Sequence, residues 1–523
     1  MSRLAPLCLA LAGPAAWPQP DDGGAAQAVL VSGERDAVVQ LPPTTSTTII
    51  GAEVIEREQA RTIFDVVRNA AGVAVDGGPR ATGMRFNIRG FRNNDDVVFK
   101  IDGGIKGFEK YRFGSGVFIE PELIRSITIE RGPSAQAGSG AIGGAITVTT
   151  KSAVDLLAPE QRFGVLAKAG YDFNNDENLV MLAGYGRPTP DSDLLVAWVR
   201  RDGDDFTLAN GLPLAASATR VDGTLIKLVT TPADDLMLEL SRTAYQSGPS
   251  FTPFDTNSSN AAIGGYVHQT IDDESLNLRF SYEPMSSWLR LRGTLARETT
   301  RLDNLMRTGL GESSFTVPCT TTPCEWRADG GPTGDMNDLW NFEIWTGELF
   351  NDTRYRLGGA RGVFSAGVQA VRNQRRLSRI TENPLMNGPE GRYPDGYDGQ
   401  QPSGTRSVFA GVLLNQLNWS DVQLNLGLRW DRYRIEAEGQ AAADLRAVGE
   451  PVAYAFTRTT PSLGLSWRPQ QGAWWFSYRW ARSFRPPLIT DYFGTGAASP
   501  CSGFFEDGVA VAPHGCGDRL VPT

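Results

Sequence analysis

The stretch VQLNLGLRWD, residues 422–431, alternates strictly between two kinds of side chain. Every second residue from Val422 to Trp430 is apolar, and the residues between them are polar or glycine. A period of two places these sets on opposite faces of a β-strand. The stretch therefore predicts a strand with one face in an apolar environment and the other in water.

The same alternation recurs through most of the chain after residue 151, where we recognise no helical pattern. Three further apolar faces are formed by Leu236, Leu238 and Leu240, by Leu289, Leu291 and Leu295, and by Trp474, Phe476, Tyr478 and Trp480. A soluble β-sandwich also alternates. Large aromatic faces opposite repeated charges favour a barrel with a wet lumen in lipid, and the aromatic run suits a girdle at a bilayer interface.

Composition limits the remaining choices. The 523 residues, 58 of them glycine, suit one large β structure in a chain of two parts. A net charge of -9 disfavours nucleic acid as a partner. After the first few positions no run of apolar residues is long enough for a membrane-spanning helix, so a membrane protein of this sequence must be a barrel.

The N-terminus has the features of an exported chain. Arg3 precedes the apolar run 4–12, and Pro14, Ala15 and Ala16 could form a cleavage region, so we expect residues 1–18 to be a signal peptide. Residues 19–48, rich in Asp, Gly and Ala near their start, are expected to be flexible.

Four cysteines lie outside this leader, in loop-like sequence. Their spacing predicts the disulfides Cys319–Cys324 and Cys501–Cys516 in an oxidising compartment. A zinc site is the alternative, although neither pair has the close spacing of common zinc modules.

Residues 49–151 mix short helical and strand patterns and predict a small α/β domain. Thr62 and Asp65 resemble a capping box at the start of a helix. Strands are expected at 84–90, 97–102, 124–131 and 145–151. The run GSGAIG, 138–143, fits a dinucleotide-binding fingerprint, but the AITVTTK that follows alternates like a strand, so a tight turn is favoured.

These residues closely resemble the plug of TonB-dependent outer-membrane receptors. The matching segments are IIGAEVIEREQARTIFDVVRNAAGVAV (49–75), FNIRGF (86–91), VVFKIDGG (97–104) and IEPELIRSITIERGPSAQAGSGAIGGAITVTTKSAVDLL (119–157). The GSGAIGG variant is similar to the haem and haemoglobin receptor branch. Upstream, AVLVSGERD (28–36) resembles a TonB box, with Val29, Leu30, Val31, Ser32 and Gly33 at its centre.

A second segment, WARSFRPPLITDYF (480–493), resembles a motif that opens an extracellular loop in haem receptors. Its central residues here are Phe484, Arg485, Pro486 and Pro487. The resemblance implies that His514 is an axial ligand of haem iron; a solvated loop histidine is the alternative. His268 is expected to be an ordinary residue in another loop.

The resemblance also implies roles for residues of the plug. Substrate contacts are expected from the loop residues Lys106, Lys110, Tyr111 and Arg112, with solvent exposure as the alternative. Charged contacts between plug and barrel wall are expected from Arg89, Glu130 and Arg131, with ordinary structural ion pairs as the alternative.

The implied fold is an α/β plug domain, residues 49–151, inside an antiparallel transmembrane β-barrel of about 22 strands when complete. Residues 152–523 are expected to form only its N-terminal part, as in a C-terminally truncated sequence.

The implied function is active import of haem or haem-protein iron across the bacterial outer membrane, driven by TonB with ExbB and ExbD. Haem, haemoglobin or a haem carrier would be the ligand, haem being cargo and not an enzymatic cofactor. A ferric-siderophore receptor is the main alternative, and a passive porin or adhesin a weaker one. An enzyme is not expected, because two loop histidines assemble no catalytic group.

Overall fold

The computed structural model describes residues 46–77, 83–92, 96–107, 116–253, 266–306, 336–381, 402–447, 449–469, 474, 476–493, 505–506 and 509–510. Several sequence predictions lie outside the described residues: the signal peptide, the TonB box at 28–36, Lys110, Tyr111, Arg112, His514 and the cysteines Cys319, Cys324, Cys501 and Cys516.

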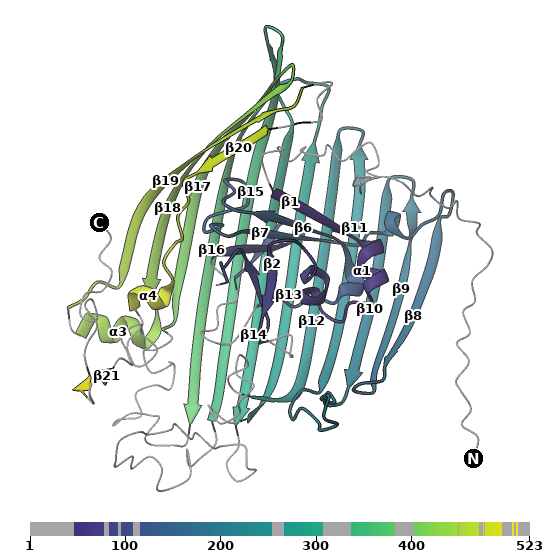
Figure 1. Cartoon of the computed structure of the whole chain (residues 1–523), viewed down its shortest axis with the longest axis vertical. Helices are drawn as coiled ribbons and strands as arrows, with labels where there is room; N and C mark the ends of the chain where they lie inside the picture. The colour runs from purple at the N-terminus through teal and green to yellow at the C-terminus, as the bar shows by residue number, and fades with distance from the viewer. Residues whose placement is uncertain are drawn as a thin grey trace. The chain divides into compact units, whose positions relative to one another are not determined.

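The N-terminal domain, which we call the plug, is built on a five-stranded sheet of order β1-β6-β7-β4-β5 (Figure 1). β4 and β7 are parallel and the other neighbours antiparallel. The elements are β1 (Ser46–Gly51), α1 (Ala52–Glu58), α2 (Ile63–Val67), β2 (Val73–Asp76), β3 (Arg85–Ile88), β4 (Val97–Ile101), β5 (Gly104–Lys106), the 3-10 turn η2 (Pro121–Leu123), β6 (Ile124–Arg131), β7 (Gly144–Thr150) and the 3-10 turn η3 (Ala153–Asp155).

Local sequence explains the boundaries of these elements. The Thr62 hydroxyl accepts a hydrogen bond from the Asp65 amide at 3.3 Å, and the Asp65 carboxylate accepts one from the Thr62 amide at 3.0 Å, which confirms the predicted capping box. Gly144 has φ +140 and its α-carbon lies against the backbone of Glu130, so only glycine fits there. Gly144 is also the first residue of strand β7, which confirms the turn before it and excludes a dinucleotide-binding helix at this position.

Thirteen consecutive strands form the second sheet, which we call the barrel sheet, with β8 and β20 at its two edges. Each strand pairs antiparallel with its sequence neighbours. The strands are β8 (Phe163–Asp172), β9 (Glu177–Thr189), β10 (Ser192–Gly203), β11 (Thr219–Ala233), β12 (Leu236–Pro253), β13 (Tyr266–Tyr282), β14 (Leu291–Met306), β15 (Met336–Leu357), β16 (Ala360–Thr381), β17 (Gly404–Trp419), β18 (Val422–Ala437), β19 (Ala453–Trp467) and β20 (Phe476–Ala481).

The two ends of the barrel sheet differ in their connections. At the end we call the short-turn end, residues 190–191, 234–235, 358–359 and 420–421 join strands. At the long-loop end the connections include 204–218, 254–265, 307–335 and 382–403. Outer-membrane barrels have short turns on the periplasmic side and longer loops outside.

The alternation predicted from the sequence holds in three dimensions. Leu295, Leu426 and Trp480 lie on the face of the sheet away from the plug and are 52%, 43% and 48% exposed. Arg429 and Asp431, on the opposite face of β18, are buried against the plug. The apolar faces therefore point outward and the polar faces inward. Among the described residues, no helix is both long and apolar enough to cross a membrane.

Two helices interrupt the region in which none was expected. α3 (Gly439–Ala447) lies in the connection between β18 and β19, and α4 (Ile489–Phe493) follows β20. The expectation of an all-strand region was therefore wrong. The alanines of α3 favour a helix, and Leu445 packs with Ile489 and Tyr492 in a cluster beside the end of β18. Two further two-residue strands, β21 (Phe505–Glu506) and β22 (Val509–Ala510), form a separate pair.

Candidate functional site

The candidate site is the polar interface between the plug and the inward face of the barrel sheet. Its largest charge cluster surrounds Arg201 on β10, which is buried. Arg201 contacts Glu120 and Glu122 of the plug at 3.1 and 3.2 Å and Glu177 at the start of β9 at 2.8 Å. Burial, opposed by Arg201, raises the pKa of the Glu120 carboxyl to about 7. This cluster fastens the chain segment before β6 to the first barrel strands.

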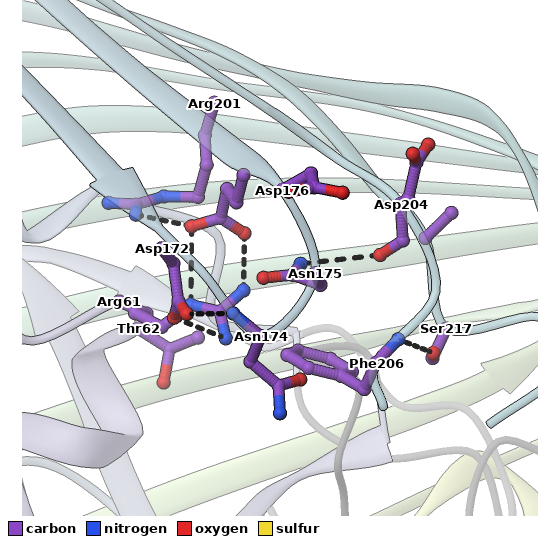
Figure 2. Close-up of polar contacts among 12 residues, drawn as sticks. Arg61, Thr62, Asp172, Asn174, Asn175, Asp176, Arg201, Asp204, Phe206 and Ser217 are labelled. Atoms are coloured by element: carbon purple, nitrogen blue, oxygen red, sulfur yellow. Dashed lines mark hydrogen bonds and ion pairs between the residues drawn. The ribbon is translucent and has the colours of Figure 1, made fainter. Parts of the chain in front are cut away.

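A second contact at this edge comes from Arg61, which precedes the capped helix α2. Its guanidinium lies 3.2 Å from Glu177 Oε1 and 3.3 Å from Asp172 Oδ2, and it stacks over the ring of Phe206 at 4.6 Å. Figure 2 shows Arg61 between the Asp172 carboxylate and the Phe206 ring. One plug side chain therefore contacts the residues on either side of the connection 173–176 and Phe206 in the connection 204–218. These are the first two connections at the long-loop end.

Those two connections are also tied to each other. The Asn174 side-chain amide donates to the Thr207 carbonyl at 2.9 Å. The Asn175 side-chain amide donates to the Asp204 carbonyl at 3.2 Å, as Figure 2 shows. The loop that holds Phe206 is thus fixed beside Arg61 by hydrogen bonds across the hairpins.

The middle of the plug sheet is held by Asp102, in the turn after β4. Its carboxylate accepts bonds from the Thr150 hydroxyl and amide at 2.5 and 3.0 Å, and Lys227 on β11 lies 3.5 Å away. Burial alone would raise the pKa of Asp102, but Lys227 and the Thr150 hydrogen bonds outweigh it and lower that pKa. Asp102 is therefore held as a carboxylate inside the interface.

Lys106, at the end of β5, reaches two barrel carboxylates. Its ammonium lies 2.6 Å from both Asp273 and Glu298, and all three groups are buried. Burial lowers the pKa of Lys106, but the two carboxylates more than reverse this and raise it. The structure places the Lys106 ammonium in an ion triplet with the barrel sheet and not in solvent, and its expected substrate contact stays a prediction.

A longer hydrogen-bonded network crosses from the plug to β18. Lys100 pairs with Glu348 at 2.7 Å, and Gln369 bonds to Glu348. Arg429 then donates to Gln369 at 2.7 Å, to the Ala135 carbonyl at 3.0 Å and to the Ser139 hydroxyl at 3.1 Å. The glycine-rich turn 138–144 is therefore a docking element, because Ser139 within it anchors the plug to the barrel sheet.

The FRPP segment lies beside this turn. The Phe484 ring packs on Tyr433, with centroids 5.5 Å apart, and the Tyr433 hydroxyl donates to Ser139 Oγ at 2.9 Å. Arg485 lies 3.9 Å from the plug carboxylate of Asp96 and 3.6 Å from Asp491 in α4. Pro486 is buried and Pro487 half-buried. The segment thus contacts the plug both directly and through β18.

Of the predicted plug–barrel residues Arg89, Glu130 and Arg131, Glu130 interacts with the barrel sheet, whereas the contacts given for the two arginines lie within the plug. Glu130 interacts electrostatically with Arg479 on β20, and Arg479 also donates to the Pro133 carbonyl. Arg131 is buried and donates to the Ser46 carbonyl at 3.4 Å, and burial together with the nearby Arg89 lowers the pKa of Arg131. A barrel contact of Arg89 and Arg131 stays a prediction.

Sequence reasoning missed Arg61, Arg201 and Lys227. The signal for Arg201 and Lys227 was present, since each is a cation on the inward side of an alternating strand, in step with Val199 and Leu225. His268 was expected in a loop but lies within β13, where its ring is 5.5 Å from Phe251. Strand pairing extends through this histidine because β12 continues opposite it.

Comparison with known families agrees with this architecture. Residues 41–145 match the TonB-dependent Receptor Plug Domain family, and residues 224–513 match the TonB dependent receptor-like, beta-barrel family. The second match covers more than half of the chain. The chain therefore belongs to the TonB-dependent receptors.

The curated relatives include proteins named TonB-dependent heme receptor A. The one from Haemophilus ducreyi is 26% identical over 405 residues, which cover 73% of this chain and 52% of the relative. The one from Haemophilus influenzae strain Rd is 25% identical over 472 residues, 86% of this chain and 60% of the relative. The chain therefore spans between half and two thirds of the length of these relatives.

Solved structures share the fold. A double mutant of the Serratia marcescens hemophore receptor HasR, in complex with its hemophore HasA and heme, superimposes with a TM-score of 0.67 at 20% identity, over 87% of this chain and 66% of that one. The FrpB iron transporter from Neisseria meningitidis gives a TM-score of 0.65 at 18% identity, over 86% and 66%.

Proposed function

We propose that this protein takes part in TonB-dependent import of haem or haem-protein iron across the bacterial outer membrane. The observation that carries the proposal is the match to relatives named heme receptors along 86% of the chain. The FRPP segment supports it, because this haem-receptor-like motif packs against both β18 and the plug. The transported ligand would be haem, free or delivered by haemoglobin or a haem carrier.

The plug interface gives this proposal a physical mechanism. The plug rests on the barrel sheet through ion pairs and hydrogen bonds, and such groups can exchange their partners for water when they separate. Force applied through residues 28–36, the proposed TonB box, would separate these ion pairs and hydrogen bonds one after another. TonB with ExbB and ExbD would supply that force from the inner membrane.

The substrate residues are part of the proposal. His514, downstream of the FRPP segment, would ligate haem iron through its imidazole, which is a common axial ligand. Lys110, Tyr111 and Arg112 would contact the ligand from the plug. The predicted disulfides would brace two of the loops.

A ferric-siderophore receptor is the second candidate. Solved structures of the siderophore receptors PiuA and PirA from Acinetobacter baumannii share the fold, each with a TM-score of 0.59. The FRPP segment favours haem over this alternative. A passive porin or adhesin is disfavoured by the plug, which such a protein would not need.

A haem titration of the protein, purified from outer membranes in detergent, tests the proposal. We expect a tight shift of the Soret band in the unaltered protein and a weakened shift in a His514→Ala variant. A His268→Ala variant is the matched control, since that residue lies in β13. Absence of any shift, together with binding of a ferric siderophore, would transfer the assignment to the second candidate.

A further inference from the structure

The outward face of β16, β17 and β18 carries an apolar groove of about 520 Å³. Pairing across the sheet places Val368, Gly411 and Trp430 in one row and Ala366, Leu413 and Leu428 in the next. Leu349 and Asn351 extend the same rows onto β15. The groove therefore runs across neighbouring strands on the side of the sheet away from the plug.

The groove is hollow because its middle residues are small. A β-carbon placed on Gly411 would meet no atom within 4 Å, and Ala366 offers a single methyl group beside it. Trp430 and Leu413, 40% and 45% exposed, form its walls. Its mostly apolar lining suits an acyl chain.

Four exposed arginines lie on the same face, toward the long-loop end. Arg432 lies one outward position beyond Trp430, about 7 Å along the strand, and Arg434 lies one further. Arg372 shares a row with Ser407 and Arg434, so these two arginines are two strands, about 10 Å, apart. Arg376 lies further along β16.

The charge on this face is unbalanced. On the described outward faces of β16, β17 and β18, Glu436 is the one acidic residue, and it pairs with Arg434 at 2.8 Å. Outward arginines on the earlier strands have acidic partners across the sheet, such as Arg297 with Glu343 at 2.8 Å. Arg434 therefore belongs to an ion pair, and Arg376 interacts electrostatically with Glu343 on β15. Arg372 and Arg432 carry the positive charge that the described acidic residues of this face do not balance.

We infer that this groove, together with Arg372 and Arg432 beside it, binds a phosphorylated acyl lipid of the outer leaflet. The inference rests on the proposed membrane location of the barrel sheet. The acyl chain lies in the groove, in the apolar band, and the phosphate contacts the arginines at the long-loop end. Guanidinium groups bind phosphate through paired, charge-assisted hydrogen bonds.

Binding of three probes to the protein in detergent, measured by native mass spectrometry, tests the inference. The probes are bisphosphorylated lipid A, dephosphorylated lipid A and inorganic phosphate. We expect the first to bind at least tenfold more tightly than the second. An Arg372→Gln, Arg432→Gln double variant should lose about 30-fold in affinity for the first, given the usual effect of a basic residue near an anionic membrane surface.

A second variant tests the groove separately. Gly411→Phe fills it from an open position on the outer face, so the protein should fold normally while lipid A binding falls at least tenfold. Arg297→Gln and Arg242→Gln are matched controls, because each replaces an outward arginine that pairs with an acidic residue. These two variants should leave lipid A binding unchanged.

Equal lipid A binding by the unaltered protein and the double variant would overturn the inference. So would inorganic phosphate displacing lipid A at micromolar concentration, which would indicate a simple anion site. A haem titration of the same samples distinguishes failure of the lipid inference from failure of the proposed function. Loss of lipid with an unchanged Soret shift supports the inference alone, and lipid binding without any Soret shift refutes only the haem proposal.

Discussion

Removal of the Arg201 side chain tests how the plug is held. Arg201→Ala would leave three buried carboxylates, Glu120, Glu122 and Glu177, without their shared cation. Arg61 remains beside Glu177, and Lys168 remains 3.4 Å from Glu122. Glu120 is therefore the carboxylate that the loss of Arg201 affects most. Breaking a buried ion pair by removing one partner costs about 3–5 kcal/mol. We expect plug docking to weaken by that amount.

The pH dependence of docking in the unaltered protein follows from Glu120. Its pKa is about 7 with the plug docked, against an ordinary value of 4.5. The docked state therefore binds a proton that the separated state releases, and docking weakens as the pH rises from 4.5 to 7. The pKa difference corresponds to about 3 kcal/mol over this window. In Arg201→Ala the loss should continue above pH 7, because Glu120 then lacks its cation.

The assay is the guanidinium concentration at which trypsin begins to cleave the plug, with tryptophan fluorescence following the barrel sheet. We expect a lower cleavage midpoint in Arg201→Ala and an unchanged fluorescence midpoint. Arg200→Ala is the matched control, because Arg200 is exposed on the opposite face and pairs with the exposed Asp202 at 3.4 Å. Equal midpoints for Arg201→Ala and Arg200→Ala would refute the reasoning.

Two further substitutions probe other parts of the interface. Gly104→Ala places a methyl group 2.5 Å from Asn277 Oδ1 and 3.0 Å from the Ala296 β-carbon, so the β5 turn should undock. Trypsin cleavage should then begin at lower denaturant than in Gly51→Ala, where a β-carbon would meet no atom within 4 Å. Phe484→Ala removes a ring packed on Tyr433 and should cost about 3 kcal/mol, read as faster hydrogen exchange in the 138–144 turn. Unchanged exchange there would contradict a connection through Tyr433.

The sequence specified the strands well, because burial on one face of a sheet imposes a period of two. Trp430 and Arg429 were assigned to opposite faces from the pattern alone, and the structure places them so. The capping box at Thr62 was also predictable, since both of its bonds are local. Helix α3 was not, because short helices in connections carry no long periodic signal.

The partners of charged residues could not be predicted from the sequence. Lys106 meets Asp273 and Glu298 across more than 160 residues of chain, and no local pattern encodes that distance. The inward cation Arg201 was visible as a break in an apolar run, but its three carboxylates come from two separate segments. Pairing of this kind depends on how the plug sits against the barrel sheet.

Energised uptake of radioiron-labelled haem by cells that carry this protein as their sole haem receptor tests the central claim most directly. The comparison is with a variant that lacks residues 28–36 but is exported to the same level. We predict uptake in the first strain and background uptake in the second, with haem binding at the cell surface equal in both. Equal uptake by the two strains would contradict TonB-driven import.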